Sequence, residues 1–487
     1  MATRKSPNHP NTNKNNLKGK QNSMATATIP HLPVLVIHHI LQFLPTKHAI
    51  RMSSLCKQWA GLWSSLPVLD FEEEGLDFDK EEDSPRAKFI NFVDRCLEIH
   101  EKYEHLDKFR LRMIFLLGFE TQYKFNKWLR FAVERRVKEL DISFSCIHQF
   151  LAVGLLSPLL NAKSITSLNL ENVTIDADWD EPIISLPSLK TLSLKTVRFK
   201  PSSFISSLIS GCPCIQYLSL TSSSSSDYNI ISMQTLLDAK SLTSLTLKFV
   251  VIMDDINNDP PVGCLPYLKT VSLTTVDMYY GTFAQLISSS PSLEHLSVSI
   301  SFPRYYNYSL PSSNLKSFEV RIFNSDVVRV IGTKSLESCT LVLESPKQIK
   351  RIQFGRCENL KHLSIRAPQL PNFTLQLHGC KHLVNASLDI PKLDFNRINS
   401  NVEWRHFYSL ANYLGKFQSF ENISLYVDDA EALIFPKNMR KFYDPPLRTV
   451  NTLTVFISSP RGAKDSKLRH SLFWLRPESL SIIYSDL

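Results

Sequence analysis

A short apolar pattern recurs along most of this 487-residue chain, and it constrains the fold more than any other feature. Each copy is about six residues long, as in LKTLSL or LEHLSV, and apolar residues alternate with polar ones in it. Its fourth residue falls, at intervals of 21 to 28 residues, on Leu140, Leu168, Leu192, Leu218, Leu245, Val271, Leu296, Phe318, Cys339, Leu363 and Ala386. Alternation with a period of two predicts a short, half-buried strand in each copy.

The interval between copies is typical of leucine-rich repeats, whose units of 20 to 29 residues share the core LxxLxL. Each unit lays down one strand, and a return segment brings the chain back one strand spacing further along, so neighbouring units share a continuous core. We therefore predict an α/β fold over 137–395, a curved solenoid with one parallel sheet. The return segments 204–218 and 283–296 have helical spacing, which predicts short helices on the convex side. Irregular repeats and a C-terminal cap are expected over 396–487.

The turn after each strand departs from the usual repeat. Apolar residues take the place of the turn asparagine at Val173, Val197, Val250 and Val276. We expect these turns to pack by burial. Three cysteines, Cys212, Cys357 and Cys380, each precede the first apolar strand residue by three positions, and we interpret them as buried packing thiols.

Motifs of common catalytic or metal sites are absent from the sequence. It contains neither GxxxxGK[ST], GxSxG nor HExxH, and its nine cysteines form no CxxC pair and no finger spacing with histidine. Glycine, at 13 residues, is too scarce for folds that depend on glycine-rich phosphate loops. We expect no catalytic residue, no metal and no cofactor.

The predicted concave face carries two rows of residues. Ser or Thr occupies the position between the two inward strand residues in eight of ten repeats, either to ease the crowding of parallel strands or to form a polar floor for a partner. Two residues further along lie Lys195, Lys248, Arg321 and Arg366. This basic ledge suits an acidic or phosphorylated partner segment, although ordinary solvated surface is the alternative. Candidate aromatic anchors are Tyr217, Trp179 and the loop Tyr305–Tyr308.

A compact apolar segment, 31–63, precedes the repeats. Apolar residues at helical spacing predict a first helix that begins at Pro33 and ends at Pro45. A second helix is expected from about Lys47 to Ser54, and a third carries Cys56 and Trp59. Helices this short cannot bury their apolar faces alone, so the segment needs a partner surface.

This segment resembles the F-box in the residues Leu32-Pro33, Ile40-Leu41-Gln42-Phe43-Leu44-Pro45 and Cys56-Lys57-Gln58-Trp59. Val34-Leu35 stands where an acidic pair usually follows Leu-Pro. Together with the repeats, the chain resembles plant F-box proteins with leucine-rich repeats. The resemblance implies the substrate-recognition subunit of a ubiquitin ligase, which holds a target protein on its repeats. It implies that a Skp-type adaptor, and through it a cullin-RING ligase, binds Leu32, Pro33, Ile37, Ile40, Leu41, Leu44, Pro45, Cys56 and Trp59.

Charge and composition suggest the remaining boundaries. Residues 1–28 form a basic tail without a single acid, 29–66 form the F-box, and 67–136 form an acidic linker and helical cap. The tail has no apolar core behind it, and no apolar stretch is long enough to cross a bilayer, so we expect a protein of the nucleus or cytoplasm with no membrane partner.

Three alternatives stay open at this point. The N-terminal helices could cap the solenoid of a scaffold protein that has no ligase attached. The tail and the basic ledge could bind nucleic acid, which we regard as the weaker reading. A small molecule could bind the repeat surface, as it does in some relatives.

Overall fold

A computed structural model describes the chain at residues 32–54, 57–73, 84–114, 119–145, 152–153, 157–176, 184–200, 204–222, 229–253, 262–299, 306–310, 314–323, 325–391, 400–459 and 465–485. The basic tail, the acidic residues 74–83, Cys56, Trp179 and Tyr305 lie outside these residues. The chain divides into two compact units, Met1–Leu66 and Pro67–Leu487.

The first unit is helical. It contains α1 (Val34–Gln42), α2 (Thr46–Ser53) and the short 3₁₀ helix η1 (Leu62–Ser65). Pro33 and Pro45 are the N-cap residues of α1 and α2, because proline fixes a backbone angle suited to a helix start. The two predicted helices are thus confirmed, whereas the described part of the third consists of turns and η1.

Five buried side chains form the core of this unit: Ile37, Leu41, Ala49, Trp59 and Leu66. The side chains of Leu32 and Leu44, among others, pack against this core and are partly buried. Gln58 Nε2 also donates a hydrogen bond to the carbonyl oxygen of Leu32, which ties the start of the unit to its last segment.

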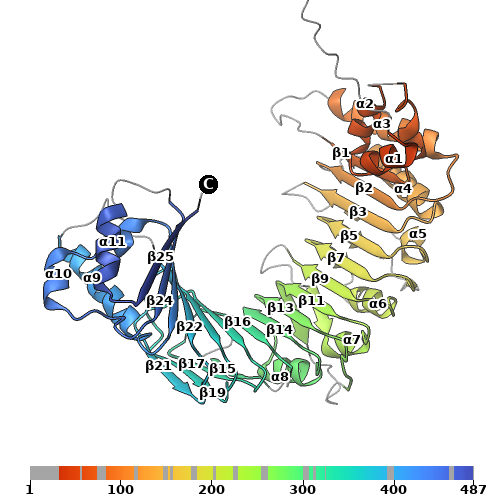
Figure 1. Cartoon of the computed structure of the whole chain (residues 1–487). Coiled ribbons are helices and arrows are strands. Elements are labelled where there is room, and N and C mark those ends of the chain that lie inside the picture. Colours follow the sequence, from red (N-terminus) through yellow and green to blue (C-terminus); the bar gives the residue numbers. More distant parts are fainter. Residues whose placement is uncertain are drawn as a thin grey trace, which may run out of the picture. The chain divides into compact units, whose positions relative to one another are not determined.

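The second unit is built on one parallel sheet of sixteen strands among the described residues (Figure 1). In spatial order these are β1 (Val68–Glu72), β2 (Lys108–Met113), β3 (Glu139–Phe144), β5 (Ser167–Glu171), β7 (Thr191–Lys195), β9 (Tyr217–Thr221), β11 (Ser244–Lys248), β13 (Thr270–Thr274), β14 (His295–Ser299), β16 (Ser317–Ile322), β18 (Ser338–Leu343), β20 (His362–Arg366), β22 (Asn385–Ile390), β23 (Asn422–Val427), β24 (Thr452–Ile457) and β25 (Ser479–Tyr484). The spatial order follows the chain order, which confirms the predicted solenoid.

Side chains alternate across this sheet as the pattern predicts. In β7, Leu192 and Leu194 are buried, Thr191 and Ser193 are half-buried, and Lys195 is exposed. The buried residues face the core that each repeat shares with its neighbours, and the others form the open face of the sheet.

Helices and short strands cover the other face. α4 (Phe119–Glu134), α5 (Ser157–Leu160), α6 (Phe204–Ser210), α7 (Met233–Asp238) and α8 (Tyr280–Ser288) lie on one side of the sheet (Figure 1). The helices expected in 204–218 and 283–296 are confirmed by α6 and α8. From residue 306 onward, strands take their place: β15 (Tyr306–Ser309), β17 (Val327–Ile331), β19 (Arg351–Gly355) and β21 (Thr374–His378) form a second parallel sheet. Segments such as VVRVI alternate and are β-branched, which favours strand over helix.

Two further short sheets lie along the return segments. One joins β4 (Ala152–Val153), β6 (Thr174–Asp176) and β8 (Arg198–Lys200), and the other joins β10 (Asn229–Ser232) and β12 (Val250–Met253). The turns that lead into β6, β8 and β12 each use a left-handed residue, at Asn172, Thr196 and Phe249. The valines that follow these residues, like Val276 in the next repeat, are buried, as predicted.

The cysteine prediction is correct at two positions and wrong at one. Cys212 and Cys357 are buried, whereas Cys380 is only half-buried. Cys380 follows β21, which is the edge strand of its sheet, so among the described residues no further strand of that sheet covers it.

The sheet extends beyond the predicted repeats at both ends. β1 and β2 lie within 67–136, the region expected to be an acidic linker and helical cap, so this region also supplies the first two strands of the sheet. This region also supplies α3 (Ser84–His100). At the other end, α9 (Ser400–Gly415), η3 (Ala430–Leu433), α10 (Lys437–Phe442) and α11 (Asp465–Trp474) separate β22 to β25, and β25 is the last strand of the sheet.

Candidate functional site

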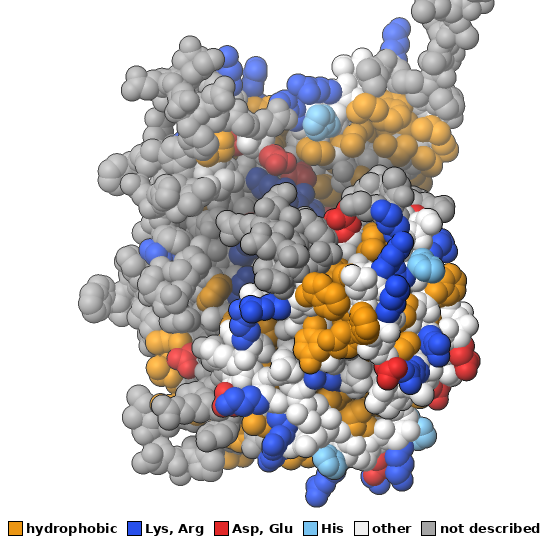
Figure 2. Space-filling view, turned by 90° about the vertical axis from the view of Figure 1, so that its left-hand side faces the viewer, with side chains coloured by type: hydrophobic (Ala, Val, Ile, Leu, Met, Phe, Trp, Pro, Cys, Tyr) orange, Lys and Arg blue, Asp and Glu red, His pale blue; other side chains and the backbone are white. Residues whose placement is uncertain are grey.

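Helix α1 exposes an apolar stripe. Val36, Ile40 and Phe43 follow one another at steps of four and three residues, so they lie on one face of the helix, and all three are exposed. Val34 and Leu35, in the first turn of α1, are also exposed but lie on other sides of the helix, and Leu35 leaves 82% of its surface exposed. Figure 2 shows, in orange, where hydrophobic side chains gather on one face of the molecule. We call Val36, Ile40 and Phe43 the α1 stripe.

The residues that the sequence predicted to bind the adaptor separate into two groups. Ile37, Leu41 and Trp59 are buried in the core of the unit, so they hold the α1 stripe in place and are not free for contact. Their prediction as contact residues needs this correction, because positions 37 and 41 lie on the face of α1 that turns inward. Leu32, Leu44 and Pro45 are half-buried, Pro33 and Ile40 are exposed, and Cys56 lies outside the described residues.

Sequence reasoning did not propose Val34, Leu35, Val36 or Phe43 as contact residues, although the structure exposes all four. The signal was present, because Val34-Leu35 stood out as apolar where charge is usual. An exposed apolar row of this size on a small helical unit marks a surface for another protein.

The predicted basic ledge on the open face is largely neutralised. Lys195 pairs with Glu171, Arg321 pairs with Glu344, and Arg366 Nε lies 3.9 Å from Asp389 Oδ2. Lys248 has no such carboxylate partner among the described residues, and its Nζ lies 5.5 Å from the ring centroid of Phe249. Exposed pairs of this kind leave little net charge to attract an acidic segment.

The predicted aromatic anchors differ in exposure. Tyr217 is exposed at the start of β9, as a contact residue requires. Tyr308 is buried, with its ring against those of Phe283 and Phe318, so its prediction as an anchor is wrong. Its strand, β15, belongs to the second sheet, which the sequence analysis did not foresee.

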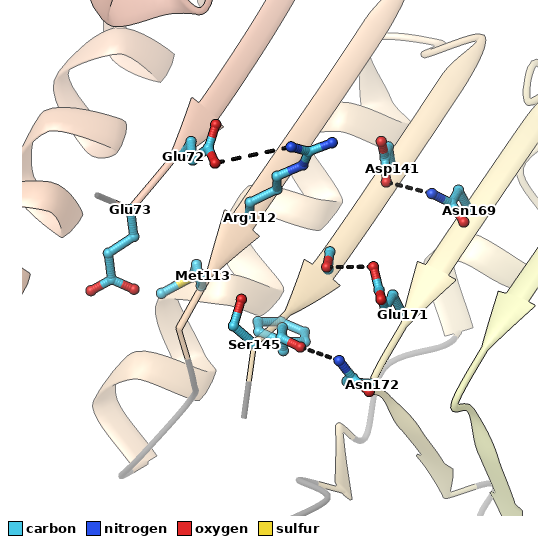
Figure 3. Close-up of a pocket in the computed structure, with 11 residues that line it drawn as sticks. Glu72, Glu73, Arg112, Met113, Asp141, Ser145, Asn169, Glu171 and Asn172 are labelled. Atoms are coloured by element: carbon cyan, nitrogen blue, oxygen red, sulfur yellow. Dashed lines mark hydrogen bonds and ion pairs between the residues drawn. The ribbon is translucent and has the colours of Figure 1, made fainter. Parts of the chain in front are cut away.

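A polar cavity of about 480 Å³ lies at the carboxyl ends of β1, β2, β3 and β5 (Figure 3). Its carboxylates are Glu72, Glu73, Asp141 and Glu171. Its other polar side chains are Arg112, Ser143, Ser145, Asn169 and Asn172. Parallel strands end at the same edge of a sheet, which is why residues from four strands meet here.

Most of these carboxylates have partners. Asp141 accepts hydrogen bonds from Asn169 Nδ2 at 2.7 Å and from Arg110 Nε at 3.1 Å. Burial by itself raises the pKa of Glu171, but hydrogen bonds from Lys195 and Ser143 outweigh it and hold the pKa below its ordinary value. Glu171 therefore stays ionised near neutral pH.

Glu73 is different. It exposes only 9% of its surface, and its Oε2 accepts a hydrogen bond of 2.9 Å from the backbone N–H of Ile114. Its Oε1 is buried and has no hydrogen-bond partner among the described residues. Figure 3 shows Glu73 at one end of the cavity and Asn172 at the other.

A second cavity, of about 680 Å³, lies on the open face near β20, β22 and β23. Tyr426 lines it and stacks on Phe456, with ring centroids 4.7 Å apart and the rings nearly parallel. Burial raises the pKa of Asp389 in its wall, and the charge of Arg366 opposes that shift. The wall combines an aromatic face with charges of both signs.

The described residues contain neither a candidate metal site nor a helix that could span a membrane. In the part of the chain that the structure describes, no group of three or more histidine, cysteine, aspartate or glutamate side chains could hold a metal ion. The helices described here are all too short or too polar to cross a bilayer.

Comparison with known proteins matches both units. A model of the F-box domain matches residues 29–71, and a model described as "FBD-associated F-box protein At5g56370, LRR repeats" matches 125–234 and 227–391. The FBD-associated F-box protein At1g66310 of Arabidopsis thaliana is 30% identical over 208 residues, which are 42% of this chain and 43% of that protein. The putative F-box/FBD/LRR-repeat protein At3g56780 of the same plant is 26% identical over 277 residues, 55% of this chain and 58% of that protein. The chain thus spans about half the length of these relatives.

Proposed function

Because the chain belongs to the FBD-associated F-box proteins with leucine-rich repeats, we propose that it is the substrate-recognition subunit of a Skp–cullin–F-box ubiquitin ligase. The first unit binds the Skp-type adaptor. The solenoid binds a target protein, which is then ubiquitinated and degraded by the proteasome. The complex acts in the nucleus or the cytoplasm.

The α1 stripe is the observation that carries this proposal. A helix that exposes Val36, Ile40 and Phe43 in one row has an unfavourable contact with water, which a hydrophobic groove on a partner relieves. The stripe lies within the residues that match the F-box model. The buried core beneath it keeps the exposed row in a fixed geometry.

The chain contributes proximity to the reaction. A target held on the solenoid brings its lysine near the thioester of the ubiquitin-charged conjugating enzyme, so a bimolecular transfer becomes effectively intramolecular. The proposal needs no catalytic residue from this chain. What it requires is two binding surfaces, one in each unit.

A pull-down with purified Skp-type adaptor tests the proposal. We expect wild-type chain to bind, and Phe43→Asp to lose binding, because a charge in an apolar groove is left without a partner. Phe442→Asp is the matched control, since Phe442 is equally exposed but lies on α10 of the second unit. Circular dichroism checks that each variant is folded.

Two outcomes contradict the proposal. One is a folded wild-type chain that does not bind the adaptor, which would favour the scaffold alternative. The other is equal loss of binding in the Phe43 and Phe442 variants, which would mean that the α1 stripe has no special part in binding.

A further inference from the structure

We propose that the polar cavity at the carboxyl ends of β1, β2, β3 and β5 binds an arginine side chain of the target protein. The inference deepens the proposed function and rests on it for the identity of the partner. The predicted basic ledge points toward an acidic partner, whereas the structure pairs three of its four cations with carboxylates and lines this cavity with four carboxylates.

The unpaired oxygen of Glu73 is the first argument. A buried carboxylate oxygen has lost its hydration, and this costs free energy unless a donor replaces the water. Glu73 Oε2 has such a donor in the N–H of Ile114, but Oε1 has none among the described residues. A cationic N–H donor that enters the cavity supplies the missing partner and a compensating charge.

The charge balance around Glu73 is the second argument. Four carboxylates line the cavity against the single cation Arg112, whose Nη1 lies 4.0 Å from Glu72 Oε1. From outside the lining, Arg110 and Lys195 neutralise Asp141 and Glu171. Among the described residues, Glu73 is thus the carboxylate of this lining that is not paired with a cation.

The sequence directly after Glu73 is acidic. The ten residues directly after Glu73 contain one lysine and the acids Glu74, Asp77, Asp79, Glu81, Glu82 and Asp83. This concentration stands in a chain whose net charge is +9. A cationic peptide is repelled by the molecule as a whole, so its binding requires a local site.

Arginine fits the acceptors better than lysine does. Its planar guanidinium presents five N–H donors in a fixed fork, which can meet a carboxylate in a bidentate geometry. The side-chain oxygens of Ser145 and Asn172 line the same cavity and are further acceptors. A volume of about 480 Å³ admits the guanidinium and its stem.

Binding of synthetic peptides to the full chain tests the inference. The probes are fluorescein-labelled nonapeptides of Gly and Ser with arginine, lysine, citrulline or glutamate at the central position, measured by fluorescence anisotropy. Citrulline keeps the shape of arginine and removes its charge. We expect the arginine peptide to bind most tightly and the citrulline peptide to bind at least tenfold more weakly.

Glu73→Gln is the decisive variant, because glutamine keeps the shape and the acceptor for the Ile114 N–H but removes the charge. We expect it to weaken the arginine peptide about tenfold and to leave the thermal midpoint unchanged or higher. Glu139→Gln is the matched control, since Glu139 begins β3 on the same sheet and pairs with Lys108 outside the cavity. It should change the affinity less than twofold.

Three results would overturn the inference: equal affinities for the arginine and citrulline peptides, equal effects of the two variants, or tighter binding of the glutamate peptide. Adaptor retention is measured on the same preparations. Loss of adaptor binding with intact peptide binding would reject the proposed function and leave the cation site standing. The reverse result would reject only the site.

Discussion

Asp94 on α3 offers a sharp test of how the start of the second unit is held together. Its carboxylate accepts a hydrogen bond from Lys124 Nζ at 2.6 Å and another from Trp128 Nε1 at 2.7 Å, both on α4. Trp128 is fully buried, and the Asp94 side chain is 14% exposed. The carboxylate therefore joins two helices through one charged and one neutral donor.

Asp94→Asn removes the charge and keeps an oxygen for Trp128. The amide cannot accept from Lys124 as well, so the charged hydrogen bond is lost, at about 1.5 to 3 kcal/mol. For a central value of about 2 kcal/mol, hydrogen exchange of the α3 and α4 amides should accelerate about 30-fold at pH 7. Exchange is the suitable assay because repeat proteins open locally.

The effect should vanish in acid. Burial by itself raises the pKa of Asp94, but the hydrogen bonds from Lys124 and Trp128 and the charges of Lys124 and Lys127 hold it below its ordinary value. A carboxylate with a lowered folded pKa stabilises the fold above its unfolded pKa of about 3.9, and this contribution is lost as the pH falls through the folded pKa. The variant and the wild type should therefore converge below about pH 4.

Asp107→Asn is the control, since Asp107 pairs with Lys138 at the exposed surface and its loss should leave exchange nearly unchanged. An acceleration below threefold in the Asp94 variant at pH 7 would refute the reasoning. So would an acceleration that persists undiminished at pH 3.

Three further predictions follow from burial. Ile37→Ala should destabilise the first unit by about 2 to 5 kcal/mol, because Ile37 is buried. Leu35→Ala should leave the urea midpoint of this unit unchanged, because Leu35 is exposed. Equal urea midpoints for the two variants would contradict the packing described. Gly211→Ala should lower the melting temperature, because its Cβ would lie 2.7 Å from the carbonyl oxygen of Ile184, whereas Gly281→Ala meets no atom within 4 Å and should not. Burial raises the pKa of Cys212 to about 12, so at pH 8 iodoacetamide should modify the exposed Cys214 much faster than Cys212. Mass spectrometry of the digested protein measures both rates, and similar rates would argue against the burial of Cys212.

The repeat architecture could be predicted because the residues of each strand show the alternating pattern within a few positions. Alternation in segments such as TLSLK places Leu192 and Leu194 inward whatever the rest of the chain does. The strands β1 and β2 were not predicted, although their sequences VLDFE and KFRLRM also alternate between apolar and polar residues. The helices α3 and α4 interrupt the regular interval between repeats, so these two strands are recognised only by their pairing in the sheet.

The candidate sites were less accessible to sequence reasoning. The sequence identified the cations of the ledge, but their partners Glu344, directly after β18, and Asp389, in β22, come from neighbouring repeats. A pair between repeats leaves no local signal in the sequence. In the sequence Glu73 is one of several neighbouring acidic residues, and nothing local distinguishes it from them. Its burial and its contact with the N–H of Ile114 depend on how β2 lies beside β1. In the first unit the F-box motif identified α1 as the helix that carries the candidate surface. Which residues of α1 are exposed and which are buried can be told only once the core of the unit is known.

Assembly with the ligase tests the central claim most directly. The full chain is mixed with purified Skp-type adaptor and the amino-terminal half of a cullin, and the mixture is separated by size-exclusion chromatography with light scattering. We predict a single 1:1:1 complex for the wild type and none for Phe43→Asp. A folded wild-type chain that elutes alone, with adaptor and cullin in excess, would contradict the claim that this protein is a ligase receptor.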